Sequence, residues 1–323
     1  MTAPTTARPQ AASGPAVGAS RTGGGDAHGR PGKAVLSDRA KAERSLGLKL
    51  AAPAAILMLA VTAYPIGYAV WLSLQRYDLR TPGENGFLGL DNYALVLGSG
   101  TFWKATAATT VITLFSVAIE FVIGLGLALV MHRAVFGRRT VRTAILVPYG
   151  IITVIAAFAF KFAVDPMAGF LGKGSNPLGD RPGSFIVIIL TEVWKTTPFV
   201  SLLLLAGLAG VPEELQEAAK VDGASAWQRL VRVTLPNMKA AILVALLFRT
   251  LDAFRIFDTV YIQTSGAYDT QTLSGVSYNT LISRVNLGLG SAISVVLFAF
   301  VLLIAFVFVK LFKTNLGAVR GER

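Results

Sequence analysis

Four charged residues alternate in sign along an otherwise apolar stretch near residue 250. They are Arg249, Asp252, Arg255 and Asp258, each three residues from the next. Residues three apart are neighbours on a helix, so each arginine can pair with an aspartate. A charge at the centre of a membrane helix costs roughly 2.5 to 3.5 kcal/mol and is tolerated for a reason. The pattern predicts a charged ribbon with two open roles: structural ion pairs, or the lining of a polar pathway.

A second polar cluster precedes another apolar stretch. Its members are Glu192, Trp194, Lys195, Thr196, Thr197 and Phe199, beside a helix break expected at Pro198. Glu192 and Lys195 are three apart, so a structural salt bridge is one interpretation. Aromatic rings beside hydrogen-bonding groups also suit an uncharged polyol, because its C–H face stacks and its hydroxyls need donors and acceptors. Isolated charges at Glu120 and Lys161 are expected to have partners on other helices.

The sequence offers little for catalysis or metal binding. It has no cysteine, and its two histidines, His28 and His132, lie far apart without a spaced partner ligand. The segment GFLGKGS superficially resembles a phosphate-binding loop, but Lys173 precedes Gly174, whereas in that motif lysine follows the second glycine. We therefore expect no catalytic residue, no metal site and no cofactor in this chain, and no ATP hydrolysis by it.

Composition determines which elements must position these residues. The chain has 323 residues, of which 53% are hydrophobic and only 15% charged, too apolar a balance for a soluble domain of this length. A helix needs roughly 20 apolar residues to cross a bilayer. Six segments qualify, at residues 50–74, 105–131, 143–164, 185–208, 240–262 and 292–311. The predicted fold class is an all-α membrane protein with six transmembrane helices.

A polar loop at residues 212–236 separates the fourth and fifth predicted spans. Pro212 fits a first helical position, and Gly223 can adopt the left-handed conformation that ends the first helix. Ser225 and Gln228 form a capping box that begins a second helix, which Pro236 is expected to stop. An amphipathic helix pair could simply lie on lipid, or it could dock a partner.

Lysines and arginines concentrate before the first span, between spans two and three, in the loop 212–236 and after the last span. By the positive-inside rule, both termini and this loop are predicted to be cytoplasmic. The same distribution accounts for the net charge of +12 without nucleic acid as a partner. Residues 1–45 have too few large apolar side chains to form a core and are predicted to be a disordered cytoplasmic tail. The six-span transmembrane domain is predicted at 46–323.

The loop also carries residues that resemble a known signature. Glu217-Ala218-Ala219, Asp222-Gly223-Ala224 and Leu235-Pro236 match, with the same spacing, the EAA loop of permease subunits in binding-protein-dependent ABC importers. The proline that often follows a few residues later is absent from Asn237–Ala241. The resemblance extends from about Leu50 onward and is closest to permeases of the maltose and trehalose type. Two further segments carry it: LVPYGIITVIAAFAFKF, and Leu251–Ala267 with its Thr264-Ser265-Gly266 turn.

The resemblance implies a type I importer fold and specific roles. The coupling residues carried over are Glu217, Ala218, Ala219, Asp222 and Gly223, which would seat in a cleft of a cytoplasmic ATPase. The pathway residues carried over are Glu192, Lys195, Thr196, Phe199, Arg249, Asp252 and Ala253. Implied partners are a second permease chain, two ATPase subunits that hold ATP and Mg²⁺, an extracytoplasmic sugar-binding protein and membrane lipid. The implied setting is a bacterial inner membrane.

The implied substrate is a disaccharide, with trehalose the best match, and two alternatives remain. A permease of the same family could carry a polyol or glycerol phosphate, with Lys195, Arg249 and Arg255 acting as a cationic clamp on the phosphate. A secondary transporter could instead use the Arg and Asp ribbon as a proton relay, without any ATPase.

Overall fold

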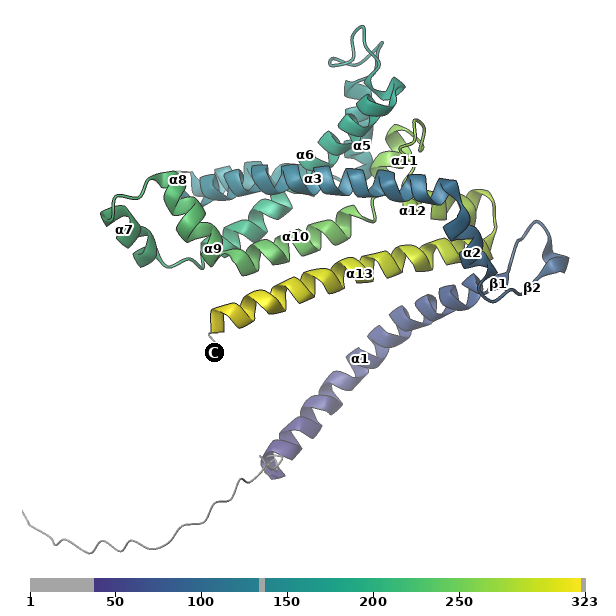
Figure 1. Ribbon diagram of the computed structural model, residues 1–323, viewed down its shortest axis with the longest axis horizontal. Coiled ribbons are helices and arrows are strands. Elements are labelled where there is room, and N and C mark those ends of the chain that lie inside the picture. Colours follow the sequence, from purple (N-terminus) through teal and green to yellow (C-terminus); the bar gives the residue numbers. More distant parts are fainter. Residues whose placement is uncertain (1–37, 134–136, 321–323) are drawn as a thin grey trace, which may run out of the picture. The chain divides into compact units, whose positions relative to one another are not determined.

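The computed structural model describes residues 38–133 and 137–320. Nearly all regular elements in this part are helices, as predicted (Figure 1). The long helices are α1 (Asp38–Ser73), α3 (Gly100–Arg133), α6 (Arg181–Leu208) and α13 (Leu287–Arg320). The shorter helices are α2 (Asp91–Gly98), α4 (Arg138–Gly150), α5 (Thr153–Ala163), α7 (Glu213–Val221), α8 (Ala226–Arg229), α9 (Leu235–Asn237), α10 (Lys239–Ala253), α11 (Asp258–Gln263) and α12 (Leu273–Tyr278). Short 3-10 helices span Pro82–Glu84 and Pro177–Gly179, and π-helical turns span Leu230–Thr234 and Asn279–Ser283.

The chain divides into two compact units, Met1–Ala60 and Val61–Arg323. Helix α1 begins at Asp38, so residues 38–45 of the expected tail are helical, and residues 1–37 lie outside the described part. The predicted domain boundary at residues 45 and 46 therefore stays a prediction.

In the second unit, helices α3 and α6 pack along most of their lengths, and α10 packs against both. One apolar cluster joins these three helices through Met131, Leu204 and Ala245. At Gly207 of α6 the fit is close, because an added Cβ would lie 2.5 Å from the Cβ of Ala241. Small residues let helix backbones approach in this way within membranes. A separate cluster containing Phe102, Phe254 and Leu273 joins α3 to α12 and α13.

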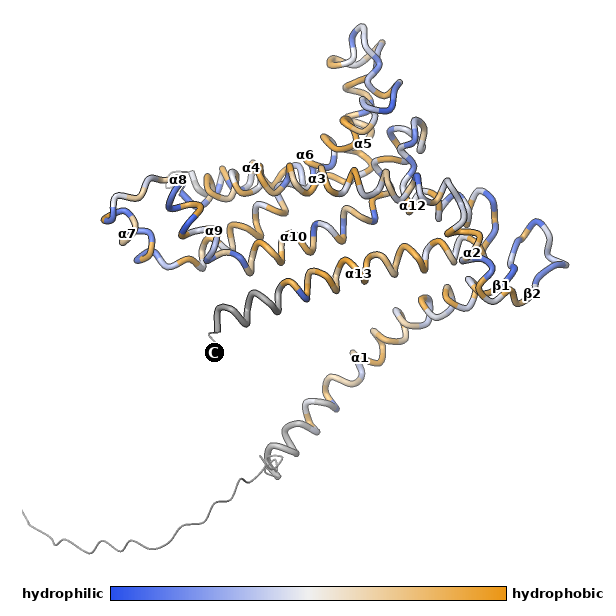
Figure 2. Tube along the Cα trace, viewed as in Figure 1, coloured by the Kyte–Doolittle hydropathy of each residue, from blue (hydrophilic) through white to orange (hydrophobic). Residues whose placement is uncertain are grey.

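Four described helices are long and apolar enough to cross a membrane, and two bent helix pairs raise the possible number to six. The apolar colouring of the long helices gives way to polar colouring in the connecting loops (Figure 2). The expected third span is not one straight helix, because α4 and α5 meet at an 87° bend. Pro148 has no N–H for the helix ladder, and Ile151 and Ile152 are extended. The span expected at 143–164 is therefore two helices joined by a bend.

The expected fifth span also differs from the prediction. Helix α10 ends at Ala253 and α11 begins at Asp258, so residues 240–262 do not form one helix. Backbone carbonyls in the intervening turn accept hydrogen bonds from distant side chains: Thr272 Oγ1 donates to Ile256 O at 3.1 Å, and Ser274 Oγ donates to Arg255 O at 3.2 Å. These tertiary contacts replace helical hydrogen bonds. At its other end, α10 meets the segment Ala226–Asn237 at a 74° bend.

A small antiparallel hairpin follows α1, formed by β1 (Gln75–Arg76) and β2 (Gly86–Phe87). Its turn carries Asp78, which accepts a hydrogen bond from Arg80 and another from Asn286 just before α13. The hydrogen bond and charge of Arg80 lower the pKa of Asp78 from 3.8 to about 2. The hairpin is thereby tied to the start of α13.

Candidate functional site: coupling loop and buried charge cluster

The loop at residues 212–236, the coupling loop, folds as its local signals predict. Gly223 has a φ of +77°, the left-handed conformation expected after α7, and nothing lies within 4 Å of an added Cβ. The Ser225 hydroxyl accepts from the Gln228 backbone N–H at 3.3 Å, and the Gln228 side-chain oxygen accepts from the Ser225 backbone N–H at 2.8 Å. The predicted capping box is therefore present.

Both prolines of the coupling loop lie slightly away from their expected positions. Pro212 caps α7 from outside rather than occupying its first turn. Pro236 does not stop the second helix: the chain passes from α8 through a π-helical turn, Leu230–Thr234, into α9, which contains Pro236. Proline has no N–H to donate to the preceding turn, and the turn just before Pro236 has the wider π-type spacing, with the Leu235 N–H donating to Leu230 O. The direction changes only at Met238, which is buried between α3 and α6.

The coupling loop exposes apolar side chains. No residue of α7, all of which is described, is buried. Val221 is 87% exposed and Trp227 is 71% exposed, and Leu215 and Val231 are exposed by about two fifths, at 43% and 41%. Of the predicted coupling residues, Glu217, Ala218, Asp222 and Gly223 are exposed and Ala219 is half-buried. Figure 1 places α7 and α8 together beyond one end of α3, so this surface projects from the helices of the second unit. Exposed apolar residues gathered on one element indicate an interaction surface.

A different arrangement surrounds Arg249 in the middle of the helices. Its guanidinium donates to Glu120 of α3 at 2.5 and 2.8 Å and to Glu192 of α6 at 3.1 Å. Thr196 donates to Glu120 at 2.8 Å, and Thr259 of α11 donates to Glu192 at 2.5 Å. We call Glu120, Glu192, Arg249, Thr196 and Thr259 the buried charge cluster. It joins α3, α6, α10 and α11 at one point.

The charged side chains at the centre of this cluster are almost completely buried. The side chains of Arg249 and Glu120 are 2% and 0% exposed. Transferring either charge alone out of water costs several kcal/mol, so each depends on its partner and on the surrounding hydrogen bonds. Arg249 also donates to Asp252 at 2.9 Å, whose carboxylate is 64% exposed. Asp252 is therefore the outer, solvent-facing member of an otherwise enclosed set.

The predicted charged ribbon is only partly present. Arg249 pairs with Asp252, as expected, but the helix ends before Arg255. Arg255 donates to Leu251 O at 3.1 Å, and within the described chain it forms no ion pair with Asp258 at the start of α11. The predicted second pair was wrong, because both residues lie outside the helix that would have aligned them.

The predicted pathway residues separate into two groups. Glu192, Thr196, Arg249 and Ala253 are buried, and the first three contact one another or Glu120. Lys195 and Phe199 are half-buried and Asp252 is exposed. Prediction of a Glu192–Lys195 salt bridge was wrong: Glu192 turns to Arg249, and Lys195 Nζ lies 5.8 Å from the centre of the Tyr149 ring.

Tyr149 is a neighbour that the sequence did not single out. Its ring stacks on Phe199, with centres 5.5 Å apart and planes 15° apart, and Lys195 Nζ lies over the Tyr149 ring. Phe160 and Trp194 form a second aromatic contact, with centres 5.6 Å apart. The only sequence signal for Tyr149 was its place beside Pro148, where α4 ends.

The two isolated charges have partners on other helices, as expected. Glu120 accepts from Arg249, and Lys161 donates to Ile262 O at 2.7 Å.

Comparison with known proteins agrees with this geometry. Residues 120–317 match the family model of the binding-protein-dependent transport system inner membrane component. The chain belongs to this family.

Curated relatives of the permease family match over nearly the same length. The trehalose transport system permease protein SugA of Mycobacterium tuberculosis is 57% identical over 275 residues, covering 84% of this chain and 90% of the relative. The trehalose/maltose transport system permease protein MalF of Thermococcus litoralis is 36% identical, covering 83% of this chain and 94% of the relative. The prediction of a transport component rather than an enzyme is confirmed, and a secondary transporter that relays protons is excluded.

A solved structure with a similar backbone gives the fold. The crystal structure of a bacterial ABC transporter for the acidic polysaccharide alginate contains a chain that is 22% identical and matches with a TM-score of 0.71. The match covers 85% of this chain and 96% of that chain. The predicted type I importer permease fold is confirmed, and the chain is an inner-membrane component. Within the described residues, no group of His, Cys, Asp or Glu is placed to hold a metal ion.

Proposed function

We propose that this chain is one permease subunit of an ATP-driven sugar importer, with trehalose as its substrate. The relatives named for trehalose and for trehalose/maltose transport support the substrate class. The observation that carries the mechanism is the coupling loop, whose apolar and EAA-type residues are exposed with nothing in the described chain covering them. Together with the EAA-type residues, such a surface supports docking of a partner.

The partner of the coupling loop would be an ATPase subunit, with Glu217, Ala218, Ala219, Asp222 and Gly223 at the contact. A second permease chain would complete the pathway, two ATPase subunits would hold the ATP and Mg²⁺, and an extracytoplasmic protein would deliver the sugar. This assembly places the coupling loop and both termini in the cytoplasm, consistent with the basic loops. The chain itself would hold no cofactor.

The structure suggests how movement at the loop could reach the pathway. Gln216 of α7 donates to Thr234 at 2.9 Å, and Thr234 donates to Arg229 O at 3.2 Å, so the two helices of the loop are linked. The chain then turns at Met238 directly into α10, which carries Arg249. A displacement of the loop would therefore tilt α10 against α3 and α6. Such rigid movement of packed helices is how alternating access is produced.

For sugar contact we favour the more exposed group, Tyr149, Lys195, Phe199 and Asp252. Two stacked rings offer an apolar face to a sugar ring, and Lys195 and Asp252 offer a donor and an acceptor. Buried Glu192, Thr196 and Arg249 would support this surface without touching the sugar. An anionic substrate is less well supported, because Arg249 is already held by carboxylates and cannot complete a clamp with Lys195 and Arg255.

The proposal is tested by uptake of radiolabelled trehalose and maltose in cells that lack this chain and every redundant importer of these sugars. The strain is complemented with wild type or with Asp222→Arg. We expect only wild type to restore trehalose uptake, with equal amounts of both proteins in the membrane. Normal trehalose uptake in the uncomplemented strain would refute the substrate assignment, and uptake restored by Asp222→Arg would refute the coupling role.

A further inference from the structure

A cavity of about 410 Å³ lies between the coupling loop and the end of α3. It is lined on the α3 side by Leu129 and Arg133, and on the loop side by residues that include Lys220, Arg229 and Thr234. A second cavity of about 380 Å³ adjoins it and shares Leu129, Arg133 and Thr234. The structure therefore holds a continuous hollow at the basic edge of the helices.

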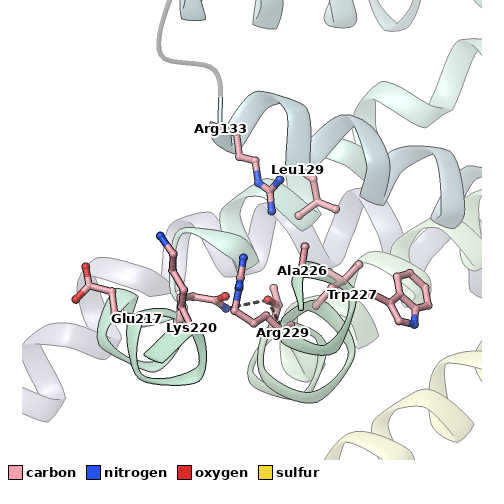
Figure 3. Close-up of a pocket in the computed structure, with 10 residues that line it drawn as sticks. Leu129, Arg133, Glu217, Lys220, Ala226, Trp227 and Arg229 are labelled. Carbon is pink, nitrogen blue, oxygen red and sulfur yellow. Dashed lines mark hydrogen bonds between the residues drawn. The ribbon is translucent and has the colours of Figure 1, made fainter. Parts of the chain in front are cut away.

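Three cations from three different helices meet at this cavity: Arg133 from α3, Lys220 from α7 and Arg229 from α8. Figure 3 shows the Arg133 side chain reaching from the end of α3 toward the loop that carries Arg229. Arg229 Nη1 donates to Ala224 O at 2.8 Å, which uses one of its five N–H groups. Within the described residues, the side chains of Arg133 and Lys220 form no ion pair and no hydrogen bond. Most donors at the cavity are therefore free.

Acidic groups near the cavity do not neutralise these cations. Glu217 is part of the lining, but it makes no salt bridge within the described chain, and its carboxylate points outward in Figure 3, away from Arg133. The adjoining cavity adds Glu213 together with His132. Counted over both cavities, three permanent positive charges face two carboxylates. A general preference for basic residues on one side of a membrane explains such charges, but not their convergence on one hollow from three helices.

We propose that this cavity binds a phosphate group. Guanidinium groups present paired donors that match two phosphate oxygens, and an ammonium adds a compact charge. The Gln216 amide lies in the same wall and keeps one N–H after its bond to Thr234 Oγ1. The phosphate can belong to an anionic lipid headgroup at the membrane edge or to a small soluble ion, and both present the same oxygens to the three cations.

A ligand at this position would link two parts of the chain that otherwise touch weakly. Arg133 lies on α3, whereas Lys220 and Arg229 lie on the coupling loop, so one phosphate would hold the loop toward α3. Binding is thus expected to favour one position of the loop. The cavity adjoins the exposed face of α7 and α8, because Glu217 and Trp227 belong to its lining, whereas the strongly exposed Val221 does not.

The test uses the purified full-length chain and measures bound lipid by native mass spectrometry. Phosphatidylglycerol and phosphatidylcholine with identical acyl chains are compared, and inorganic phosphate is added as a soluble competitor. Binding of inorganic phosphate alone is followed by ³¹P NMR. The variants are Arg133→Gln and Lys220→Gln. Arg232→Gln is the matched control, because Arg232 is an exposed cation of the same loop that does not line the cavity. Circular dichroism and the unfolding temperature verify that each variant is folded.

We expect each cavity variant to weaken binding about tenfold, the effect of losing one charge-assisted contact, while the control changes it less than twofold. Selective retention of phosphatidylglycerol identifies a lipid headgroup, whereas binding of inorganic phosphate that displaces no lipid identifies a soluble ion. Equal weakening by Arg232→Gln would show general attraction to a basic surface and overturn the proposal. Absence of binding by either probe to folded wild type would overturn it as well.

Discussion

The buried charge cluster and the coupling loop are both rich in charged residues, but their surroundings are opposite. Around Arg249 every charged side chain except Asp252 is enclosed and has a partner. In the coupling loop the charges of α7 are exposed, and apolar residues are exposed beside them. Buried, paired charges hold helices in one arrangement. Exposed charged and apolar side chains are instead available to bind a second molecule. One region is therefore expected to matter for folding and the other for coupling.

Replacing Arg249 should have the largest effect on stability. Arg249→Met removes the partner of two enclosed carboxylates, Glu120 and Glu192, and an unpaired buried charge costs about 3 to 5 kcal/mol. We expect a large fall in the unfolding temperature of the purified chain and little protein in the membrane. An unfolding temperature equal to that of wild type would mean that the cluster does not hold the helices together.

A more conservative change in the same cluster should cost less. Glu120→Gln keeps one acceptor for Arg249 and removes one charge, so we expect a loss of about 1 to 3 kcal/mol. Thermal unfolding of this variant beside Arg249→Met separates the loss of charge from the loss of the whole side chain. If Glu120→Gln were as damaging as Arg249→Met, the loss of one charge alone would account for the whole destabilisation, and the smaller expected loss would be wrong.

The coupling loop should respond in the opposite way. Gly223→Val meets no atom within 4 Å, but it places a β-branched residue at a φ of +77°, which costs about 1 to 2 kcal/mol. The strain is local to the turn between α7 and α8, so we expect the protein to remain folded while uptake is lost. Gly47→Val is the control for substituting an exposed glycine, since that position also has open space. Wild-type uptake by Gly223→Val would remove the coupling role from this turn.

The two regions differ in how well the sequence predicts them. The difference depends on how far apart in the sequence the interacting residues lie. The coupling loop depends on contacts over three to five residues, so its capping box and the glycine at its turn were visible as a pattern. The buried charge cluster joins residues up to 129 positions apart, and no spacing rule links Glu120 to Arg249. The early end of α10 has the same cause, because Thr272 and Ser274 supply the hydrogen bonds that replace the helix. The partners of Glu120 and the end of α10 depend on residues far away in the sequence, and helical periodicity carries no information about such contacts.

The smallest effects on stability are expected at Tyr149 and Asp252, the more exposed side chains that are proposed to contact the sugar. Tyr149→Leu removes the stack on Phe199, which is worth about 0.5 to 1.5 kcal/mol. Asp252→Asn weakens an ion pair whose carboxylate is exposed, and such pairs contribute about 0 to 1 kcal/mol. We expect both variants to fold and to raise the KM for sugar uptake. An unchanged KM in both variants would mean that Tyr149 and Asp252 do not contact the sugar.

The most direct test of the contrast is the amount of trehalose transported per ATP hydrolysed by the assembled importer in proteoliposomes. Wild type, Gly223→Val and Glu120→Gln are compared at equal protein, with the unfolding temperature of each recorded. The account predicts that Gly223→Val loses nearly all transport at a nearly unchanged unfolding temperature, while Glu120→Gln unfolds earlier but keeps the wild-type ratio whenever it is folded. A wild-type ratio for Gly223→Val, or a lost ratio for folded Glu120→Gln, would contradict the assignment of coupling to the loop and of stability to the cluster.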